Sequence, residues 1–309
     1  MSICSIFSYD IGISLSSNAN FDVVSSIRSS KPAKIFIPGI RVENFKDHLD
    51  FEIEHIQSIN PSIKKVKNKI FIYDNWKDHI PTYIYFFLYK IFDYLYQKKK
   101  MISFHSSAIS FDNKGILLVG ETGDGKTNTM LESVLNHNAG YLSNNRTTLQ
   151  RRKGEIFITG GTNVVSLRVQ DVYRYPQLKK YITSNETFSF NPEIAFNIQD
   201  IGIQPESLPI PLNFICLVKI DGTSQEFLKV DSFSSIIHLY NNASLTSWGE
   251  CLLFDGKTCS PRFESSLLAQ RRLDFIKFLV KKYPVYSIRG SKCFICEKIM
   301  EIKNGYQIV

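Results

Sequence analysis

Residues 115–127 read GILLVGETGDGKT, an apolar run that leads into a glycine-rich loop. Residues 120–127 match the pattern G-x-x-x-x-G-K-[ST] at every fixed position, and the sequence that follows has the spacing of a helix. Glycine permits backbone conformations with φ > 0 and a close approach of the main chain to a ligand. The N–H groups of such a loop and of the following helix form a cradle for phosphate. A glycine-rich turn without a ligand is the alternative, but the agreement of the fixed positions and both flanks favours a phosphate loop.

The residue types of this loop predict individual roles. Lys126 is expected to reach the terminal phosphates of a nucleotide, and the Thr127 hydroxyl is expected to hold Mg²⁺ as a metal ligand. The predicted cofactors are therefore ATP and Mg²⁺, although the pattern does not distinguish ATP from GTP. The predicted nucleotide-binding residues are Gly120, Glu121, Thr122, Gly123, Asp124, Gly125, Lys126, Thr127 and Asn128.

The composition is that of a globular chain with an excess of cations. With 309 residues, the chain is long enough for one large domain or two ordinary ones. Its net charge of +8 would suit nucleic acid, a membrane surface or an acidic substrate. The cations occur in short clusters, such as residues 98–100 and 151–153, which is typical of a solvated surface. We therefore expect no nucleic-acid partner.

The sequence indicates neither a membrane span nor a disulfide framework. Its most apolar run, residues 83–92, is too short to cross a bilayer and contains Lys90. No signal peptide is recognisable, so we expect a cytoplasmic protein without a membrane partner. The six cysteines are scattered, which argues against a disulfide framework. Cys293 and Cys296 have C-x-x-C spacing without a second pair of zinc ligands, so they are expected to be two buried thiols near a strand.

The apolar patterns divide the chain into three parts. Residues 1–80 are expected to form a small β-rich domain, because their apolar residues alternate as in antiparallel strands. Residues 81–100 are expected to form a linking helix, because aromatic residues recur at helical spacing. Residues 101–309 are expected to form the nucleotide-binding domain. The strands expected in the first part are residues 11–15, 33–37, 51–54 and 69–73.

Strand and helix patterns alternate in the third part. Residues 139–143 are expected to form a short strand that ends at Asn144-Asn145-Arg146. Residues 181–211 contain several prolines and are expected to form long loops, which could supply a lid over the nucleotide. Other strands are expected at residues 102–111, 164–169, 214–220 and 285–288, and helices at 232–240 and 267–282.

The order and spacing of several motifs resemble the HPr kinase/phosphorylase superfamily, whose core is similar to that of ATP-using phosphoenolpyruvate carboxykinases. The closest resemblance is to stand-alone HPr-kinase-like proteins found beside peptide natural-product genes, some of which phosphorylate a peptide serine. The resemblance covers residues 100–170. Its motifs are His105-Ser106-Ser107-Ala108, the loop 120–127, Glu132 on the next helix, and Gly140-Tyr141-Leu142-Ser143-Asn144-Asn145.

This resemblance implies an α/β fold with a P-loop HPr-kinase-like core, in which helices cover a mixed sheet, plus a small β-rich N-terminal domain. It implies an ATP-dependent kinase that transfers phosphate to a hydroxyl of a peptide or small molecule. His105 would lie beside the phosphates, and Arg146 and Arg168 could meet a phosphate or the acceptor. Glu132 would support the site or be an exposed helix carboxylate. The catalytic residues implied are His105, Lys126, Asn144, Asn145 and Arg146.

The Asn144-Asn145 pair departs from the family pattern, which usually has Asp-Asp there. A carboxylate binds Mg²⁺ and can take the proton of an attacking hydroxyl, whereas an amide ligates weakly and cannot accept that proton. Three interpretations remain open: a kinase that uses another base, a nucleotide-binding regulatory or scaffold protein without transferase activity, and a different chemistry on ATP. The first is favoured, with His105, Glu121 or Asp124 as the base, and a homo-oligomer is compatible with all three.

Overall fold

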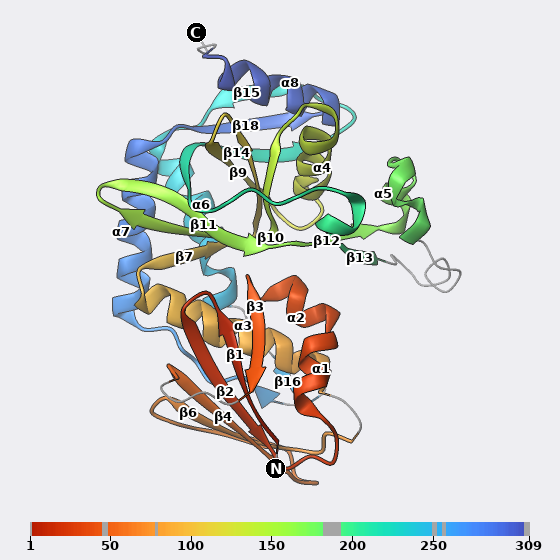
Figure 1. Cartoon of the computed structure of the whole chain (residues 1–309). Helices are drawn as coiled ribbons and strands as arrows, with labels where there is room; N and C mark the ends of the chain where they lie inside the picture. The colour runs from red at the N-terminus through yellow and green to blue at the C-terminus, as the bar shows by residue number, and fades with distance from the viewer. Residues whose placement is uncertain are drawn as a thin grey trace. The chain divides into compact units, whose positions relative to one another are not determined.

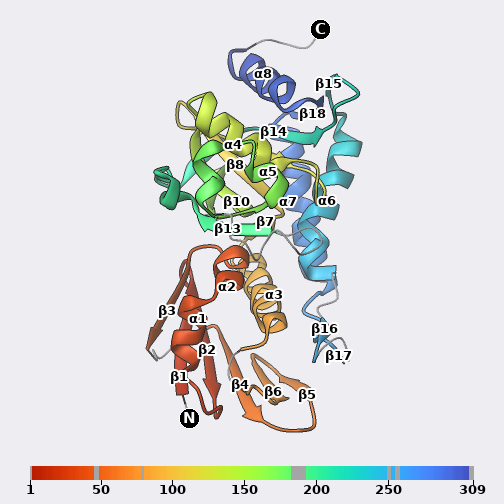
Figure 2. The same cartoon turned by 90° about the vertical axis from the view of Figure 1, so that its right-hand side faces the viewer.

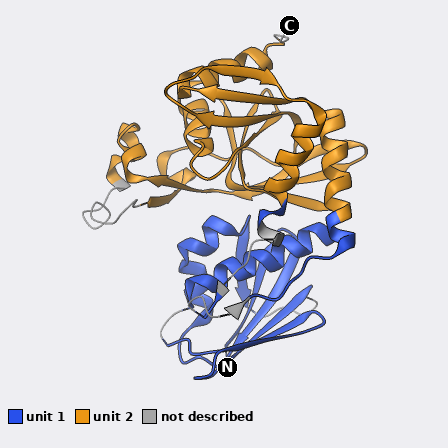
Figure 3. Ribbon diagram, turned by 180° about the vertical axis from the view of Figure 1, so that it is seen from behind, with its two compact units in different colours: residues 1–99, 244–269 blue, residues 100–243, 270–309 orange. Residues whose placement is uncertain are grey.

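The computed structural model describes residues 2–44, 49–77, 80–181, 193–248, 252–254 and 258–305. The chain divides into two compact units, which Figure 3 colours separately. Unit 1 comprises residues 1–99 and 244–269, and unit 2 comprises residues 100–243 and 270–309. Among the described residues, the structure has no helix that is long and apolar enough to cross a membrane.

These units differ from the expected domains at two places. Helix α3 (Thr82–Lys98), expected as a linker, belongs to unit 1. Its Phe86 ring lies 4.3 Å from that of Phe36 between centroids, and its Phe87 ring lies 6.2 Å from that of Phe263. The second difference is that residues 244–269 return to unit 1. Local periodicity could not predict this return, because it depends on contacts such as that of Phe263 with a distant helix.

Unit 1 contains a six-stranded sheet in the order β3-β1-β2-β4-β6-β5. Strands β1 and β2, and likewise β5 and β6, form antiparallel hairpins, but β2 pairs with β4 and β4 with β6 in parallel. The expectation of antiparallel strands was therefore wrong for these two pairs, because apolar alternation does not encode strand direction. The strands are β1 Ser2–Ser8, β2 Ile11–Ser17, β3 Ile40–Asn44, β4 Phe51–Gln57, β5 Ser62–Val66 and β6 Lys69–Asp74, and a short pair consists of β16 Leu252–Leu253 and β17 Thr258–Cys259.

The strand expected at residues 33–37 is wrong, because this segment lies mostly in a helix. Helix α1 (Val23–Ser29) is followed directly by α2 (Lys31–Phe36). The Ser30 hydroxyl accepts the Ala33 N–H at 3.1 Å and caps α2, and proline occupies the first turn. Both features are strong signals for a helix start, and they prevail over the short alternating pattern.

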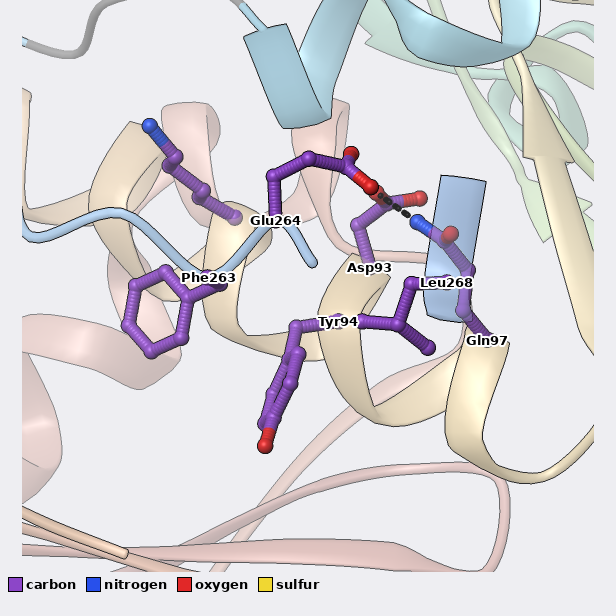
Figure 4. Close-up of a pocket in the computed structure, with 7 residues that line it drawn as sticks. Asp93, Tyr94, Gln97, Phe263, Glu264 and Leu268 are labelled. Atoms are coloured by element: carbon purple, nitrogen blue, oxygen red, sulfur yellow. Dashed lines mark hydrogen bonds between the residues drawn. The ribbon is translucent and has the colours of Figure 1, made fainter. Parts of the chain in front are cut away.

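Helix α3 brings polar residues into the interior of unit 1. Lys90, Asp93 and Gln97 are 6%, 2% and 4% exposed, respectively. The Gln97 amide donates to Asp93 at 2.9 Å, and Figure 4 shows both side chains beside Glu264 at a small cavity. The cavity measures about 10 Å³, enough for about one water molecule. It is therefore too small to be a substrate site.

Unit 2 is built on an eight-stranded mixed sheet in the order β11-β10-β8-β9-β14-β18-β15. Strand β7 also pairs with β10, and β11 pairs with β14 as well as β10, so that the sheet curls back on itself. Strands β9, β14 and β18 are parallel, and their carboxyl ends share one edge. The bounds are β7 Met101–Phe104, β8 Ser106–Phe111, β9 Lys114–Val119, β10 Gly140–Arg152, β11 Glu155–Thr162, β14 Ile210–Ile220, β15 Glu226–Lys229 and β18 Val285–Gly290.

Helices cover both faces of this sheet, which agrees with the expected α/β architecture. Helices α4 (Lys126–Asn136) and α8 (Lys292–Lys303) share one apolar core with the sheet. The unit 2 parts of α6 (Ser232–Trp248) and α7 (Ser266–Lys282) share the other core. Figures 1 and 2 show the two helix pairs on opposite sides of the sheet.

Helix α8 corrects the interpretation of the C-x-x-C pair. Both cysteines lie on this helix, and only Cys296 is buried, whereas Cys293 is exposed. The Cys296 thiol lies 3.6 Å from the Ser133 hydroxyl of α4. Residues three apart are neighbours on a helix, so the two thiols lie where the buried face of α8 meets its exposed face.

Residues 181–211, expected to form long loops, include a strand and a short 3₁₀ helix, so that expectation was wrong for part of the segment. Strands β12 (Val164–Arg168) and β13 (Glu193–Asn197) pair antiparallel. Between them lie α5 (Val169–Val172) and the 3₁₀ helix η1 (Pro176–Tyr181), and η2 (Ile198–Ile201) follows. Residues 182–192 lie outside the described residues, so the expected lid stays a prediction.

Candidate nucleotide-phosphate site

The phosphate loop, residues 120–127, connects the carboxyl end of β9 to the start of α4. Gly123 and Gly125 have φ values of 94° and 91°, a region that favours glycine. A Cβ atom on Gly125 would lie 2.4 Å from Ile220 Cδ1 on the neighbouring strand β14. The glycines therefore allow the loop to turn tightly against β14, and residues 121–123 stay exposed.

The Lys126 side chain lies along the loop. Its Nζ donates to the Gly120 carbonyl at 3.0 Å and to the Glu121 carbonyl at 2.8 Å, and the residue is only 7% exposed. The pKa of Lys126 is lowered to about 8, mainly by burial and also by the positive charge of Arg146, while Asp124 and Glu121 oppose the shift. A buried cation held only by carbonyl oxygens is a favourable partner for an anion.

One N–H group of the loop already holds an anionic group. The Asp124 carboxylate accepts the Glu121 N–H at 2.5 Å, while the Asp124 carbonyl accepts the Ile220 N–H at 2.8 Å. The second bond fixes the loop to β14. The first shows that the loop directs an N–H group toward a negative charge, as a phosphate cradle requires.

Thr127 is joined to the sheet through Asn144. The Thr127 hydroxyl donates to Asn144 Oδ1 at 3.0 Å, and the Ser107 hydroxyl of β8 donates to the same oxygen at 2.8 Å. Asn144 is fully buried, and its Nδ2 has no hydrogen-bond partner among the described residues. Through its hydrogen bond with Thr127, Asn144 lies directly at the phosphate loop.

The strand carrying Asn144 is longer than predicted. Instead of ending there, β10 continues to Arg152, and a bulge leaves Asn145 and Arg146 unmatched between Asn144 and Thr147. Asn145 has φ of 60°, which Asn tolerates better than most residues. Its side-chain amide reaches the Val164 carbonyl at 3.5 Å. The backbone alone can therefore explain Asn at position 145, whereas Asn144 contacts the loop residue.

His105 lies between β7 and β8 in an environment that keeps it neutral. Its pKa is lowered to about 3, mainly by burial and also by the positive charges of Arg146 and Lys126. These interactions bring three predicted site residues together. Asn242 of α6 holds the His105 backbone from both sides: its Oδ1 accepts the N–H at 2.9 Å, and its Nδ2 donates to the carbonyl at 3.1 Å.

Arg168 ends β12 beside the phosphate loop. Its Nη2 lies 3.6 Å from the position that a Cβ atom of Gly123 would occupy. Guanidinium groups bind phosphate through planar, paired donors. The expectation that Arg168 could reach a phosphate from a neighbouring strand is therefore consistent with its place over the loop.

Asn128 and Glu132 have packing partners on α4. The Tyr175 hydroxyl donates to the Asn128 carbonyl at 3.2 Å and lies 3.4 Å from its side-chain oxygen. Glu132 is 7% exposed, forms an ion pair with Lys292 of α8 and accepts from Asn136 at 2.7 Å. Glu132 is thus neither an exposed carboxylate nor a ligand of the loop, but a link between α4 and α8.

The residues fit a Mg²⁺ ion that is bound mainly by the phosphates of a nucleotide. Thr127 uses its hydroxyl hydrogen on Asn144, which leaves its oxygen lone pairs for a cation. Among the described residues, no group of three or more His, Cys, Asp or Glu side chains could hold a metal ion. The phosphate oxygens would have to supply most of the ligands.

A second hollow in unit 2 lies away from these residues. It measures about 550 Å³ and is lined by the start of α6, the end of α7 and the adjoining strands, including Lys229, Lys281 and Lys282. None of the predicted site residues lines it. Residues 120–127 are the candidate phosphate site because the loop geometry and a buried lysine coincide there.

Sequence reasoning missed the residues that support the site from a distance. Asn242 contacts His105 from 137 positions away, and Lys292 meets Glu132 from α8. Neither has a motif, and only the folded topology brings them to their partners. Ser107 belongs to the motif His105-Ser106-Ser107-Ala108. Its position two residues after His105 could therefore have indicated that it lies near the site.

Comparison with known proteins finds similarity among solved structures. No protein-family model matches the chain, and no curated protein matches it. Among solved structures, the Hpr(Ser) kinase/phosphatase from Coxiella burnetii is similar at 7% sequence identity and a TM-score of 0.31, covering 65% of this chain and 98% of that chain. What this chain does is therefore inferred from its own residues.

Proposed function

We propose that this protein is an ATP-dependent phosphotransferase that moves the terminal phosphate of ATP to a hydroxyl of a peptide or small molecule. The observation that carries the proposal is the phosphate loop, in which Lys126 lies buried against the Gly120 and Glu121 carbonyls. A nucleotide would give this cation the anionic partner that the carbonyls replace only in part. The sequence resemblance to HPr kinases suggests the hydroxyl acceptor.

The transfer would need charge stabilisation and one proton acceptor. The acceptor oxygen forms a bond to the terminal phosphorus while the bond from phosphorus to the bridging oxygen breaks, and ADP leaves. Lys126, Arg146 and Arg168 would stabilise the charge of the transferred group. Where Mg²⁺ accompanies the nucleotide, Thr127 and the phosphate oxygens would hold it.

His105 is our candidate for the proton acceptor. Its depressed pKa leaves the imidazole unprotonated at neutral pH, so a nitrogen is available to take the hydroxyl proton. Bound phosphate would raise this pKa, because a nearby negative charge favours imidazolium. Asp124 is less suitable, because its carboxylate is held by the Glu121 N–H.

Product analysis tests the proposal. The protein is incubated with ATP, Mg²⁺ and hydroxyl-bearing peptides, and ADP and phosphorylated acceptor are measured by mass spectrometry. We expect both products, in equal amounts. Tight ATP binding without ADP or a modified acceptor would reject the transferase.

The second candidate is a nucleotide-binding regulatory or scaffold protein. Asn144 favours it, because a buried amide stands where it touches Thr127 and cannot accept a proton. Asn145→Asp distinguishes the candidates: it should raise turnover if the amide only weakens a kinase site, and it should leave a non-catalytic protein inactive.

Nucleotide affinity is expected to depend on the protonation of Lys126. Its free-state pKa of about 8 means that the cation is lost as pH rises through 8. Because the phosphates need the charged form, the apparent Kd should rise about tenfold per pH unit above 8. Calorimetry at pH 7, 8 and 9 should also show proton uptake at the highest pH.

The control is Lys126→Arg, which stays charged throughout this range. Its ATP affinity, whatever its value at pH 7, should not fall between pH 8 and 9. His105, with its pKa near 3, should add no change near pH 6.5. Wild-type affinity that stays constant up to pH 10 would contradict the assigned environment of Lys126.

A further inference from the structure

Asn144 occupies a position where a carboxylate could hold a metal ion, but its side chain carries no charge. Its Oδ1 accepts hydroxyl hydrogens from Thr127 and Ser107 at 3.0 and 2.8 Å. Its Nδ2, buried with no partner among the described residues, is a donor. A donor repels a metal cation and attracts an anionic oxygen. Asn144 therefore offers no negative charge to a metal ion beside Thr127.

The charges around the loop favour the same ligand. Among the described residues, Lys126 Nζ donates to two carbonyl oxygens, and Arg168 lies over Gly123. Arg146 interacts with Lys126 strongly enough to affect its ionisation. The loop also carries two negative charges, the carboxylates of Glu121 and Asp124. The chain thus supplies the positive charge that a carboxylate-held metal would otherwise bring.

We propose that this site binds the nucleoside polyphosphate as its metal-free anion, with Asn144 as the residue that sets this preference and Lys126, Arg146 and Arg168 as the counter-charges. This inference rests on the proposed nucleotide function and specifies its ligand. Mg²⁺ would then add little to the affinity.

The test compares ATP binding in EDTA with ATP binding in excess MgCl₂ by calorimetry. For the wild type, we expect dissociation constants within about threefold of each other. Asn144→Asp should weaken binding in EDTA at least about tenfold, because its carboxylate repels the free polyphosphate. The same variant should keep or gain affinity in MgCl₂. Asn144→Ser, which adds no charge, should show no such metal dependence.

Asn138→Asp is the matched control. It adds the same charge at an exposed residue with φ of 56°, which Asp tolerates, just beyond α4. The length of this helix puts it about 15 Å from the loop, beyond the screening length of about 8 Å. We expect it to bind ATP like the wild type in both solutions.

The outcomes separate the two proposals. Absence of ATP binding in both solutions would reject the nucleotide function itself. Wild-type binding that requires MgCl₂ would overturn the metal-free preference and leave the nucleotide function standing. If circular dichroism shows that Asn144→Asp does not fold, the wild-type comparison decides alone, with Asn144→Ser reporting whether the amide is needed.

Discussion

Replacing Lys126 by alanine is expected to weaken ATP binding about 100-fold or more, with the fold intact. The lysine would make charge-assisted hydrogen bonds to the terminal phosphates, each contributing about 1.5–3 kcal/mol, and about 3 kcal/mol corresponds to a 100-fold change in Kd. In the free protein, Nζ bonds only to the Gly120 and Glu121 carbonyls, which water can reach once it is removed. Calorimetry gives the affinity, and thermal unfolding monitors the fold.

Lys114→Ala provides the control for loss of a positive charge. Lys114 is exposed at the start of β9, whereas the loop follows the end of that strand. The strand rises about 3.3 Å per residue, so Lys114 is too far to touch the phosphates. Its replacement should leave the ATP affinity within about twofold of the wild type, since surface charges at this distance are screened. Equal affinity in Lys126→Ala and the wild type would contradict the site.

Replacing Gly125 by alanine is expected to destabilise unit 2 by about 2–5 kcal/mol and to abolish ATP binding. A left-handed backbone costs a non-glycine residue about 1–2 kcal/mol, and overpacking adds about 1–3 kcal/mol. The overpacking arises because the new Cβ would lie 2.4 Å from Ile220 Cδ1 and 2.9 Å from Ile220 Cβ. Ile220 cannot move away freely, since its N–H holds the Asp124 carbonyl. Urea unfolding and calorimetry measure the two effects.

Gly154→Ala separates strain from steric overlap. Gly154 has φ of 80°, but a Cβ atom there would meet nothing within 4 Å. We expect only the conformational cost of about 1–2 kcal/mol and unchanged ATP affinity. If Gly125→Ala were no more destabilising than Gly154→Ala, the close packing of the loop against β14 would be wrong.

The phosphate loop could be predicted from sequence because its chemistry is local. The glycines, Lys126 and Thr127 are adjacent in the chain, and the apolar run before them lies in β9 as expected. The helices near residues 82–98 and 266–282 were also predictable, since their apolar spacing extends over several turns. Long periodic patterns survive tertiary packing better than short ones.

The rest depends on contacts between distant segments. The pattern near Asn144 suggested a strand end, but pairing with β11 continues β10 through a bulge to Arg152. Residues 33–37 alternate, yet the Ser30 cap and a proline begin a helix there. Asn242 gave no signal at all, because its role exists only once α6 meets His105. The lowered pKa of His105 likewise arises only in the folded chain, where burial, Arg146 and Lys126 act on it.

Calorimetric titration of the wild-type protein with ATP tests the central claim, that the phosphate loop binds a nucleotide's polyphosphate. We predict saturable 1:1 binding that inorganic tripolyphosphate competes away and that Lys126→Ala loses. Binding that survives in Lys126→Ala, or no heat from ATP or GTP with a folded protein, would contradict the account.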